Sequence, residues 1–237
     1  MFPVAGRLDV LPEDPRRMLE LLTEVVSAWR GGLGEPKGCT PEELVAAEDL
    51  IGTRIPDPLR SFLALYGHRE DLMGFQDPLL LPGGMWMEGG DVLVFQEENQ
   101  KCALWGISIE ALNELDPPVL CKNVNDGDGD WLPYQDRLSV HLLETALNEL
   151  MTSSGNSMFR EADAEAVRVL SASLTRIGIP EHVFWAEPEG SVVKWLASAD
   201  FLVRVDGDSM IWASAPLGQE VQGVLDVVSS GWERADI

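Results

Sequence analysis

The first part of the chain has the hydrophobic pattern of helices. Over residues 14–30, apolar positions recur at steps of three and four, which predicts a helix with one buried face. Thr40-Pro41-Glu42-Glu43 has the form of a capping box with proline in the first turn, so a second helix is expected to start there. Asp57-Pro58 repeats the cap-then-proline pattern and predicts a third, short helix that ends at Gly67.

After Gly67 the hydrophobic period changes from that of helices to that of strands. The runs 91–95 and 102–107 are short and rich in β-forming residues, and the polar residues 97–101 separate them, which predicts a β-hairpin. Residues 117–121 are expected to form the next strand, at a sheet edge or strand start because of their prolines. A helix over about 138–151 is expected to follow.

The last part of the chain predicts a further unit of helices and strands. TSSGNS, residues 152–157, is typical of a domain boundary. Beyond it we expect a helix over about 161–178, strands near 183–186, 201–205 and 210–214, a hairpin turn at Asp206-Gly207-Asp208, and a helix over about 219–230. The fold class is therefore α+β, with an N-terminal helix and linker over 1–38, a domain with a mainly antiparallel sheet flanked by helices over 39–155, and a smaller appended unit over 156–237.

The charge of the chain favours some partners and disfavours others. Its 237 residues are 45% hydrophobic, an ordinary globular balance, but 40 acidic residues against 17 basic ones give a net charge of -23. Such a charge repels phosphate backbones and attracts basic proteins. We therefore expect no nucleic-acid partner, and either a basic protein partner or an acidic surface that serves only solubility.

The sequence shows no sign of a membrane span, a secretory leader or a cofactor. No window approaches the roughly 18 consecutive apolar residues of a membrane helix, and the first residues lack a basic segment before an apolar core, so a cytoplasmic protein is expected. Cys39, Cys102 and Cys121 form no close pair, which indicates neither a disulfide framework nor a Cys-x-x-Cys metal site. We expect no cofactor and no metal.

The segment NDGDGD, residues 125–130, resembles a calcium-binding loop only at first sight. Alternating aspartates in a glycine-rich loop supply the oxygen ligands that calcium prefers. A calcium-binding EF-hand loop that starts at Asp126 would need glycine where Trp131 stands and glutamate where Arg137 stands. An acidic turn is the preferred interpretation, and a divalent-metal site is the alternative.

The remaining catalytic candidates also have simpler explanations. Glu97 and Glu98 are adjacent, so on a strand their carboxylates point to opposite faces and do not form a catalytic pair. His68, His141 and His182 lie beside no recognisable serine or cysteine motif and are expected at the surface or in loops. The sequence therefore predicts no catalytic residue and no enzyme activity.

Two tryptophans have different expected roles. Trp105 follows an apolar run and is expected in the core, beside a glycine that permits close packing. Trp86 stands in the glycine-rich segment PGGMWMEGG, where it either anchors an interface or is buried by its own loop. Both possibilities for Trp86 stay open at this point.

Three groups of residues in a fixed order form a pattern known from one family. The turn Glu98-Asn99-Gln100 precedes Trp105-Gly106, and Trp131 precedes a helix that contains Leu143. Upstream of both stand Glu48, Gly52, Ile55-Pro56, Leu59, Phe62-Leu63 and Gly67. Over roughly residues 42–152, this order resembles the SUKH superfamily, the bacterial relatives of the yeast Smi/Knr cell-wall regulator. Tyr66, Leu138 and Leu142 depart from the residues usual in that family.

The resemblance implies a non-enzymatic binding fold. Many bacterial members are immunity proteins that bind and block a toxin, and a basic toxin suits the acidic charge of this chain. The alternatives are a housekeeping scaffold without a toxin and, in a different class, a divalent-metal-dependent protein. The hypothesised partner-binding residues are Trp86, Glu97, Glu98, Asn99, Gln100, Asp126, Asp128 and Asp130. The residues taken as structural are Glu48, Pro56, Gly67, Trp105, Gly106 and Trp131.

Overall fold

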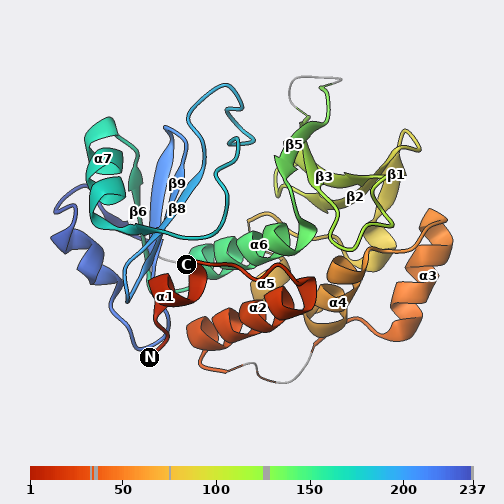
Figure 1. Ribbon diagram of the computed structural model, residues 1–237, viewed down its shortest axis with the longest axis horizontal. Helices are drawn as coiled ribbons and strands as arrows, with labels where there is room; N and C mark the ends of the chain where they lie inside the picture. The colour runs from red at the N-terminus through yellow and green to blue at the C-terminus, as the bar shows by residue number, and fades with distance from the viewer. Residues whose placement is uncertain (33, 35–36, 75, 125–128, 236–237) are drawn as a thin grey trace. The chain divides into compact units, whose positions relative to one another are not determined.

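The computed structural model describes residues 1–32, 34, 37–74, 76–124 and 129–235. The chain forms two compact units, which we call unit 1 and unit 2. Unit 1 consists of Met1–Leu11, Glu24–Leu33 and Leu150–Ile237, and unit 2 consists of Pro12–Thr23 and Gly34–Glu149. Among the described residues each unit contains one antiparallel sheet with helices, so the predicted α+β class is confirmed (Figure 1).

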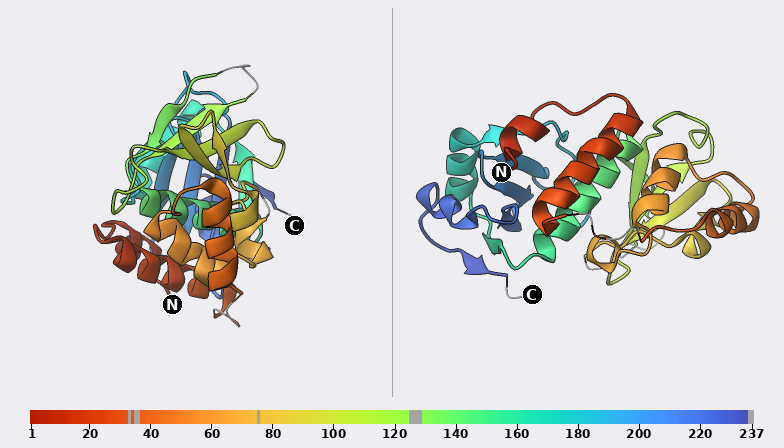
Figure 2. Two further views of the ribbon diagram at one scale, coloured as in Figure 1. Left: turned by 90° about the vertical axis from the view of Figure 1, so that its right-hand side faces the viewer. Right: turned by 90° about the horizontal axis from the view of Figure 1, so that it is seen from below.

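In unit 2, α3 (Pro41–Ile51) begins where its capping signal predicted, whereas α4 (Asp57–Tyr66) has Pro56 at its N-cap and no side chain that caps it, so Asp57 is not the cap expected from the sequence. In α3 the Thr40 hydroxyl accepts from the Glu43 N–H and the Glu43 carboxylate accepts from the Thr40 N–H, which completes the capping box. The helix ends at Gly52, whose φ of 75° suits glycine. In Figure 1 and the left view of Figure 2, the orange helices α3 and α4 lie together beneath the yellow-green strands. The other helices with residues in unit 2 are α2 (Pro15–Arg30), α4 (Asp57–Tyr66), α5 (Glu70–Met73) and α6 (Leu138–Thr152).

Sheet A of unit 2 is a meander in which each strand pairs with the next along the chain. The predicted hairpin is confirmed as β2 and β3, with Val92 opposite Ser108 and a register shift between Val94 and Gln96. Both strands are buried over their first five residues, which explains why their sequences are apolar runs and do not alternate. The strands are β1 (Trp86–Glu88), β2 (Val92–Glu97), β3 (Ala103–Ser108), β4 (Val119–Asn123) and β5 (Leu132–Gln135).

Sheet B of unit 1 has the strand order β11-β6-β10-β9-β8-β7. The predicted hairpin turn at residues 206–208 is confirmed, with Gly207 at a φ of 55° between β9 and β10. One face of the sheet packs against α7 (Ala164–Ser173) and the 3-10 helix η2 (Val221–Asp226). The strands are β6 (Ser157–Glu161), β7 (Thr175–Arg176), β8 (Lys194–Ala197), β9 (Leu202–Asp206), β10 (Met210–Ser214) and β11 (Glu233–Arg234).

Several expectations for the C-terminal part were wrong. Residues 183–186 are described but form only isolated bridges, at His182 with Val193 and at Phe184 with Glu187. The expected helix over 219–230 is the short η2, and Ser157 of the expected linker starts β6. Strand β6 pairs with β10, which lies some fifty residues further along, so its strand character depends on a contact that local sequence does not reveal.

The structure divides the chain differently from the predicted boundaries. Residues 1–11 do not form a unit with the following linker. The N–H groups of Val4 and Ala5, in α1 (Val4–Leu8), donate to the carbonyls of Ala199 and Ser198, and the Gly178 N–H donates to the carbonyl of Leu8. These bonds make the N-terminal segment part of unit 1.

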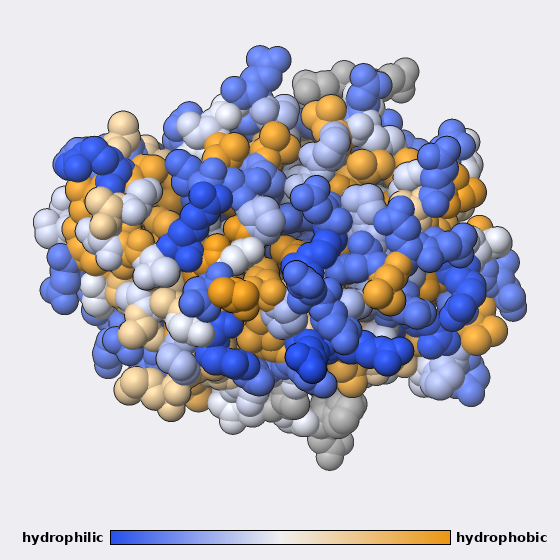
Figure 3. All heavy atoms as spheres, in the orientation of Figure 1, coloured by the Kyte–Doolittle hydropathy of each residue, from blue (hydrophilic) through white to orange (hydrophobic). Residues whose placement is uncertain are grey.

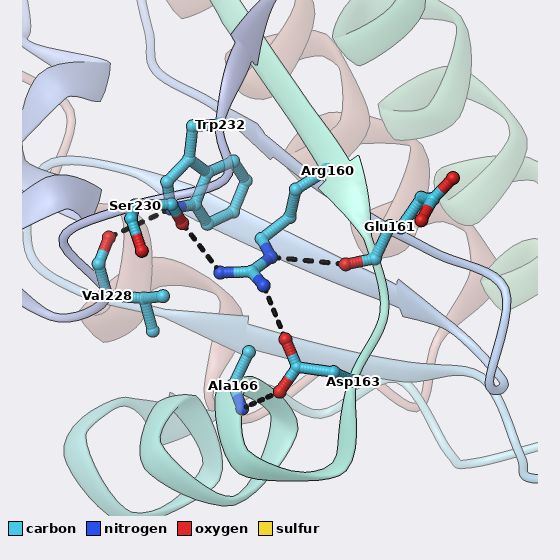
Figure 4. Close-up of polar contacts among 7 residues, drawn as sticks. All are labelled: Arg160, Glu161, Asp163, Ala166, Val228, Ser230 and Trp232. Atoms are coloured by element: carbon cyan, nitrogen blue, oxygen red, sulfur yellow. Dashed lines mark hydrogen bonds and ion pairs between the residues drawn. The ribbon is translucent and has the colours of Figure 1, made fainter.

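Arg160 ties the C-terminal segment to strand β6 (Figure 4). Its guanidinium donates to the carbonyl of Ser230 at 2.7 Å and to the carboxylate of Asp163, and it lies 6.0 Å from the centre of the Trp232 ring. The Trp232 indole N–H in turn donates to the carbonyl of Val228. One arginine therefore holds the turn before β11 and the N-terminus of α7.

Candidate functional site

The strand register of sheet A brings most of the predicted contact residues to one end of the sheet. Neighbouring strands of a meander run in opposite directions. One end of the sheet therefore holds the starts of β1, β3 and β5 and the ends of β2 and β4. Trp86 opens β1, residues 97–100 join β2 to β3, and Asp130 precedes β5. The Val124 N–H donates to the carbonyl of Cys102, which fixes the start of the β4–β5 connection beside the hairpin turn. We call Trp86, Glu97, Asn99, Gln100 and Asp130 the sheet-end site.

The hairpin turn within the sheet-end site is held by a buried carboxylate. Glu98 is 4% exposed, and its Oε2 accepts hydrogen bonds from the backbone N–H of Gln100 at 2.8 Å and of Cys102 at 3.1 Å. Lys101 has a φ of 64°, a conformation that the turn requires. The expectation that Glu98 is available to a partner was wrong, because its carboxylate is turned inward to satisfy these two donors.

The other residues of the sheet-end site stay accessible. Asn99, Gln100 and Asp130 are exposed, and Trp86 is half-buried, so its own loop does not bury the indole completely. Glu97 is half-buried and forms an ion pair with Lys101 at 3.6 Å. Asp126 and Asp128, which were predicted to bind the same partner, lie outside the described residues.

Replacing Glu98 with alanine is expected to destabilise unit 2 by about 2 kcal/mol, because two backbone donors lose a charged acceptor inside a tight turn. Gln100→Ala is the matched control, since its exposed side chain lies in the same turn and its loss is expected to cost less than about 0.5 kcal/mol. Urea denaturation followed by circular dichroism measures both. Equal midpoints for the two variants would contradict the role assigned to Glu98.

The residues taken as structural all have packing or backbone roles. Glu48 accepts hydrogen bonds from the Ile55 N–H at 3.2 Å and from Arg60 at 3.3 Å, and Pro56 stands at the start of α4. Trp105 is 2% exposed. A Cβ on Gly106 would lie 2.4 Å from Val92 and 3.1 Å from the half-buried Trp131, so glycine is required there.

His141 is not a surface histidine, which corrects the expectation from the sequence. It is 3% exposed, and its Nε2 lies 2.6 Å from Oε1 of Gln96. The rings of Phe95 and Tyr134 lie 5.6 Å from its own, centre to centre. The cause is that α6 is buried along its whole length and therefore has no face toward water. His182 is also buried, at 6% exposure, whereas His68 is exposed as expected.

A groove of about 610 Å³ lies on the surface of unit 2 between α3 and the 3-10 helix η1 (Pro82–Gly84). Most of its lining is apolar, and Leu50 and Leu81 are 71% and 47% exposed. Figure 3 shows hydrophobic residues scattered among polar ones on one molecular face, so exposed leucines are not by themselves unusual. The lining is Glu43, Ala46, Ala47, Leu50, His68, Leu81, Pro82, Gly83 and Gly84.

Three side chains with metal-binding chemistry meet beside this groove. Nε2 of His68 lies 3.1 Å from Oε1 of Glu43, and the ligand atoms of Cys39, Glu43 and His68 all lie within 4.8 Å of one another. Cys39 is buried, whereas Glu43 and His68 are exposed and line the groove. Sequence analysis missed this cluster, because it considered only cysteine spacing and these residues come from two separate helix ends.

The electrostatics of the cluster argue against a cysteine nucleophile. Burial, followed by the negative charge of Glu43, raises the pKa of Cys39 to about 11, so the free thiol is protonated at neutral pH. Reactive cysteines have lowered pKa values. Hydrogen bonds from the Thr40 N–H and from His68 hold the pKa of Glu43 below its usual range. The cluster is therefore an ionised carboxylate beside a histidine and an inert thiol.

Comparisons with known proteins add no relative: no family model, no curated protein and no solved structure matches this chain. The resemblance to the SUKH superfamily therefore rests on the residue motifs. No helix in the described ranges is long and apolar enough to cross a membrane.

Proposed function

We propose that this chain is a non-enzymatic protein-binding module of the immunity type, which binds and neutralises a basic toxin in the cytoplasm through the sheet-end site. The observation that supports the proposal is the register of sheet A. It gathers a tryptophan, an exposed polar turn and acidic residues at one end of a rigid sheet. Half-buried aromatic residues among polar ones are typical of interface hot spots.

The hairpin turn is suited to binding because it is already ordered. Association costs free energy when loops and side chains must be immobilised, and a preformed turn reduces that cost. Here the buried Glu98 carboxylate and the backbone bond from the Lys101 N–H to the Glu98 carbonyl hold the turn from inside. Asn99 and Gln100 are therefore presented by a fixed backbone.

The charge of the chain supports a basic partner. A net charge of -23 creates a long-range field that steers a basic protein toward the surface and raises the association rate. Because salt screens this field, the association rate is expected to fall as ionic strength rises. The final affinity depends on desolvated side chains, and Trp86 is the largest of these in the sheet-end site.

Co-expression with a toxin whose gene is found next to the gene of this chain tests the proposal, with cell survival and isolation of a complex as the measurements. Trp86→Ala is expected to weaken the complex by about 30-fold, corresponding to about 2 kcal/mol for a hot-spot tryptophan. Trp185→Ala replaces a half-buried tryptophan of unit 1 and is expected to leave the affinity unchanged. Lack of both rescue and complex formation would reject the proposal.

A further inference from the structure

We propose that Cys39, Glu43 and His68 form a binding site for one zinc ion, with a fourth coordination position open to the groove beside α3. The site is separate from the sheet-end site, and the inference does not depend on the proposed function. It is argued from the donor atoms, their separations and the backbone that holds them.

The donor set matches the ligands of zinc. Thiolate sulfur, imidazole nitrogen and carboxylate oxygen are the three ligand types that zinc takes from proteins. A soft sulfur ligand disfavours magnesium and calcium, which bind oxygen ligands. Three protein ligands with an open fourth position are typical of zinc centres that keep a water or exchangeable ligand.

The separations between the ligand atoms are close to those of a tetrahedral centre. Bond lengths of about 2.3 Å to sulfur and 2.0–2.2 Å to nitrogen and oxygen place tetrahedral ligands roughly 3.4–3.6 Å apart. In this protein Glu43 and His68 are already 3.1 Å apart, and all three ligand atoms lie within 4.8 Å of one another. Small side-chain rotations are enough to bring them to a common ion.

The backbone holds the three residues in place without the ion. The Cys39 N–H donates to the carbonyl of Leu63 at 2.8 Å, and the His68 N–H donates to that of Lys37 at 2.7 Å, so the start of α3 is fastened to the end of α4. A Cβ on Gly67 would lie 2.3 Å from the Cys39 sulfur. Glycine before His68 therefore makes room for the thiol at the site.

The groove makes the fourth position accessible. Glu43 and His68 line the groove, whereas Cys39 lies behind them. An ion bound to all three is therefore reached by water from the groove side. Coordination also removes the proton from the thiol, so the inert Cys39 of the free protein is compatible with a thiolate ligand in the bound one.

Titration of the full chain, after treatment with a chelator, with Zn²⁺ in a calorimeter and with Co²⁺ in a spectrophotometer tests the inference. We expect one ion per chain, a sulfur-to-cobalt charge-transfer band in the near ultraviolet and the visible spectrum of tetrahedral cobalt. Excess Mg²⁺ is expected not to displace Zn²⁺, since it avoids sulfur ligands.

Variants of the three ligands, together with one control, separate this site from binding elsewhere on an acidic surface. Cys39→Ser and His68→Gln are each expected to weaken Zn²⁺ binding at least about 100-fold, since even outer-shell changes cost about 10–100-fold. Glu43→Gln removes the charge but keeps a side chain able to complete the capping box, so α3 stays intact. Cys102→Ser, at a half-buried cysteine outside the cluster, is expected to bind like the unaltered chain.

Two results would overturn the inference. One is no uptake of Zn²⁺ or Co²⁺ by the folded chain. The other is equal affinity in Cys39→Ser, His68→Gln and the unaltered chain, with displacement by Mg²⁺, which would assign the binding to carboxylates of the surface. Circular dichroism of each variant establishes that it is folded, so a loss of binding reports on the ligands.

Discussion

Asp206→Ala is expected to destabilise unit 1 by about 3–5 kcal/mol, because it removes the buried carboxylate to which the Arg204 guanidinium donates. The side chains of Arg204 and Asp206 are 6% and 11% exposed, and Nε of Arg204 donates to Oδ1 of Asp206 at 2.5 Å. The guanidinium also lies 5.5 Å from the centre of the Trp195 ring. Urea denaturation measures the loss, and amide hydrogen exchange in sheet B locates it.

Two controls distinguish charge burial from a general effect of substitution. The double variant Arg204→Met with Asp206→Leu removes both charges and is expected to be clearly more stable than Asp206→Ala, because apolar pairs replace buried ion pairs well. Glu165→Ala breaks the solvent-exposed pair with Arg168 and is expected to change the midpoint little. If Asp206→Ala lowered the denaturation midpoint no more than Glu165→Ala does, the ion pair of Arg204 and Asp206 would not stabilise sheet B.

Trp105→Ala is expected to destabilise unit 2 by about 3–5 kcal/mol, since it combines lost burial with a cavity that the sheet does not refill. The indole is 2% exposed and meets the ring of Tyr134 edge-on, with centres 6.0 Å apart. Chemical denaturation followed by far-ultraviolet circular dichroism measures the change.

Leu132→Ala is the matched control for Trp105. Leu132 lies on β5 of the same sheet but is 44% exposed, and its replacement is expected to change the free energy of unfolding by less than about 0.5 kcal/mol. If Trp105→Ala lowered the free energy of unfolding no more than Leu132→Ala does, the indole would contribute little to the stability of the core.

The elements that sequence predicted correctly are those formed by neighbouring residues. The capping box at Thr40 and Glu43 joins residues three apart, and the hairpin joins two apolar runs across a short turn. Strand β6 and the 3-10 helix η2 were missed or misjudged. Their structure depends on pairing with β10 and packing in the core of unit 1, and local patterns carry neither.

The same distinction, between contacts of neighbouring residues and contacts of distant segments, applies to the candidate sites. The residues proposed to bind a partner stand in separate segments of the chain, and the meander of sheet A brings Trp86, the hairpin turn and Asp130 to one end. Sequence also assigned Glu98 to the surface, because a glutamate in a polar turn is usually solvated. The free N–H groups of a tight turn gave its carboxylate an inward role instead.

By itself, the sequence determined the net charge, the capped helix α3, the central hairpin and the α+β class, because these depend on composition and on contacts between near neighbours. Tertiary structure alone decided that the N-terminal segment belongs to unit 1, that His141 is buried and that Cys39 meets Glu43 and His68. Each of these depends on segments far apart in the chain. The contacts between these segments depend on how whole helices and strands pack, and no local sequence pattern predicts them.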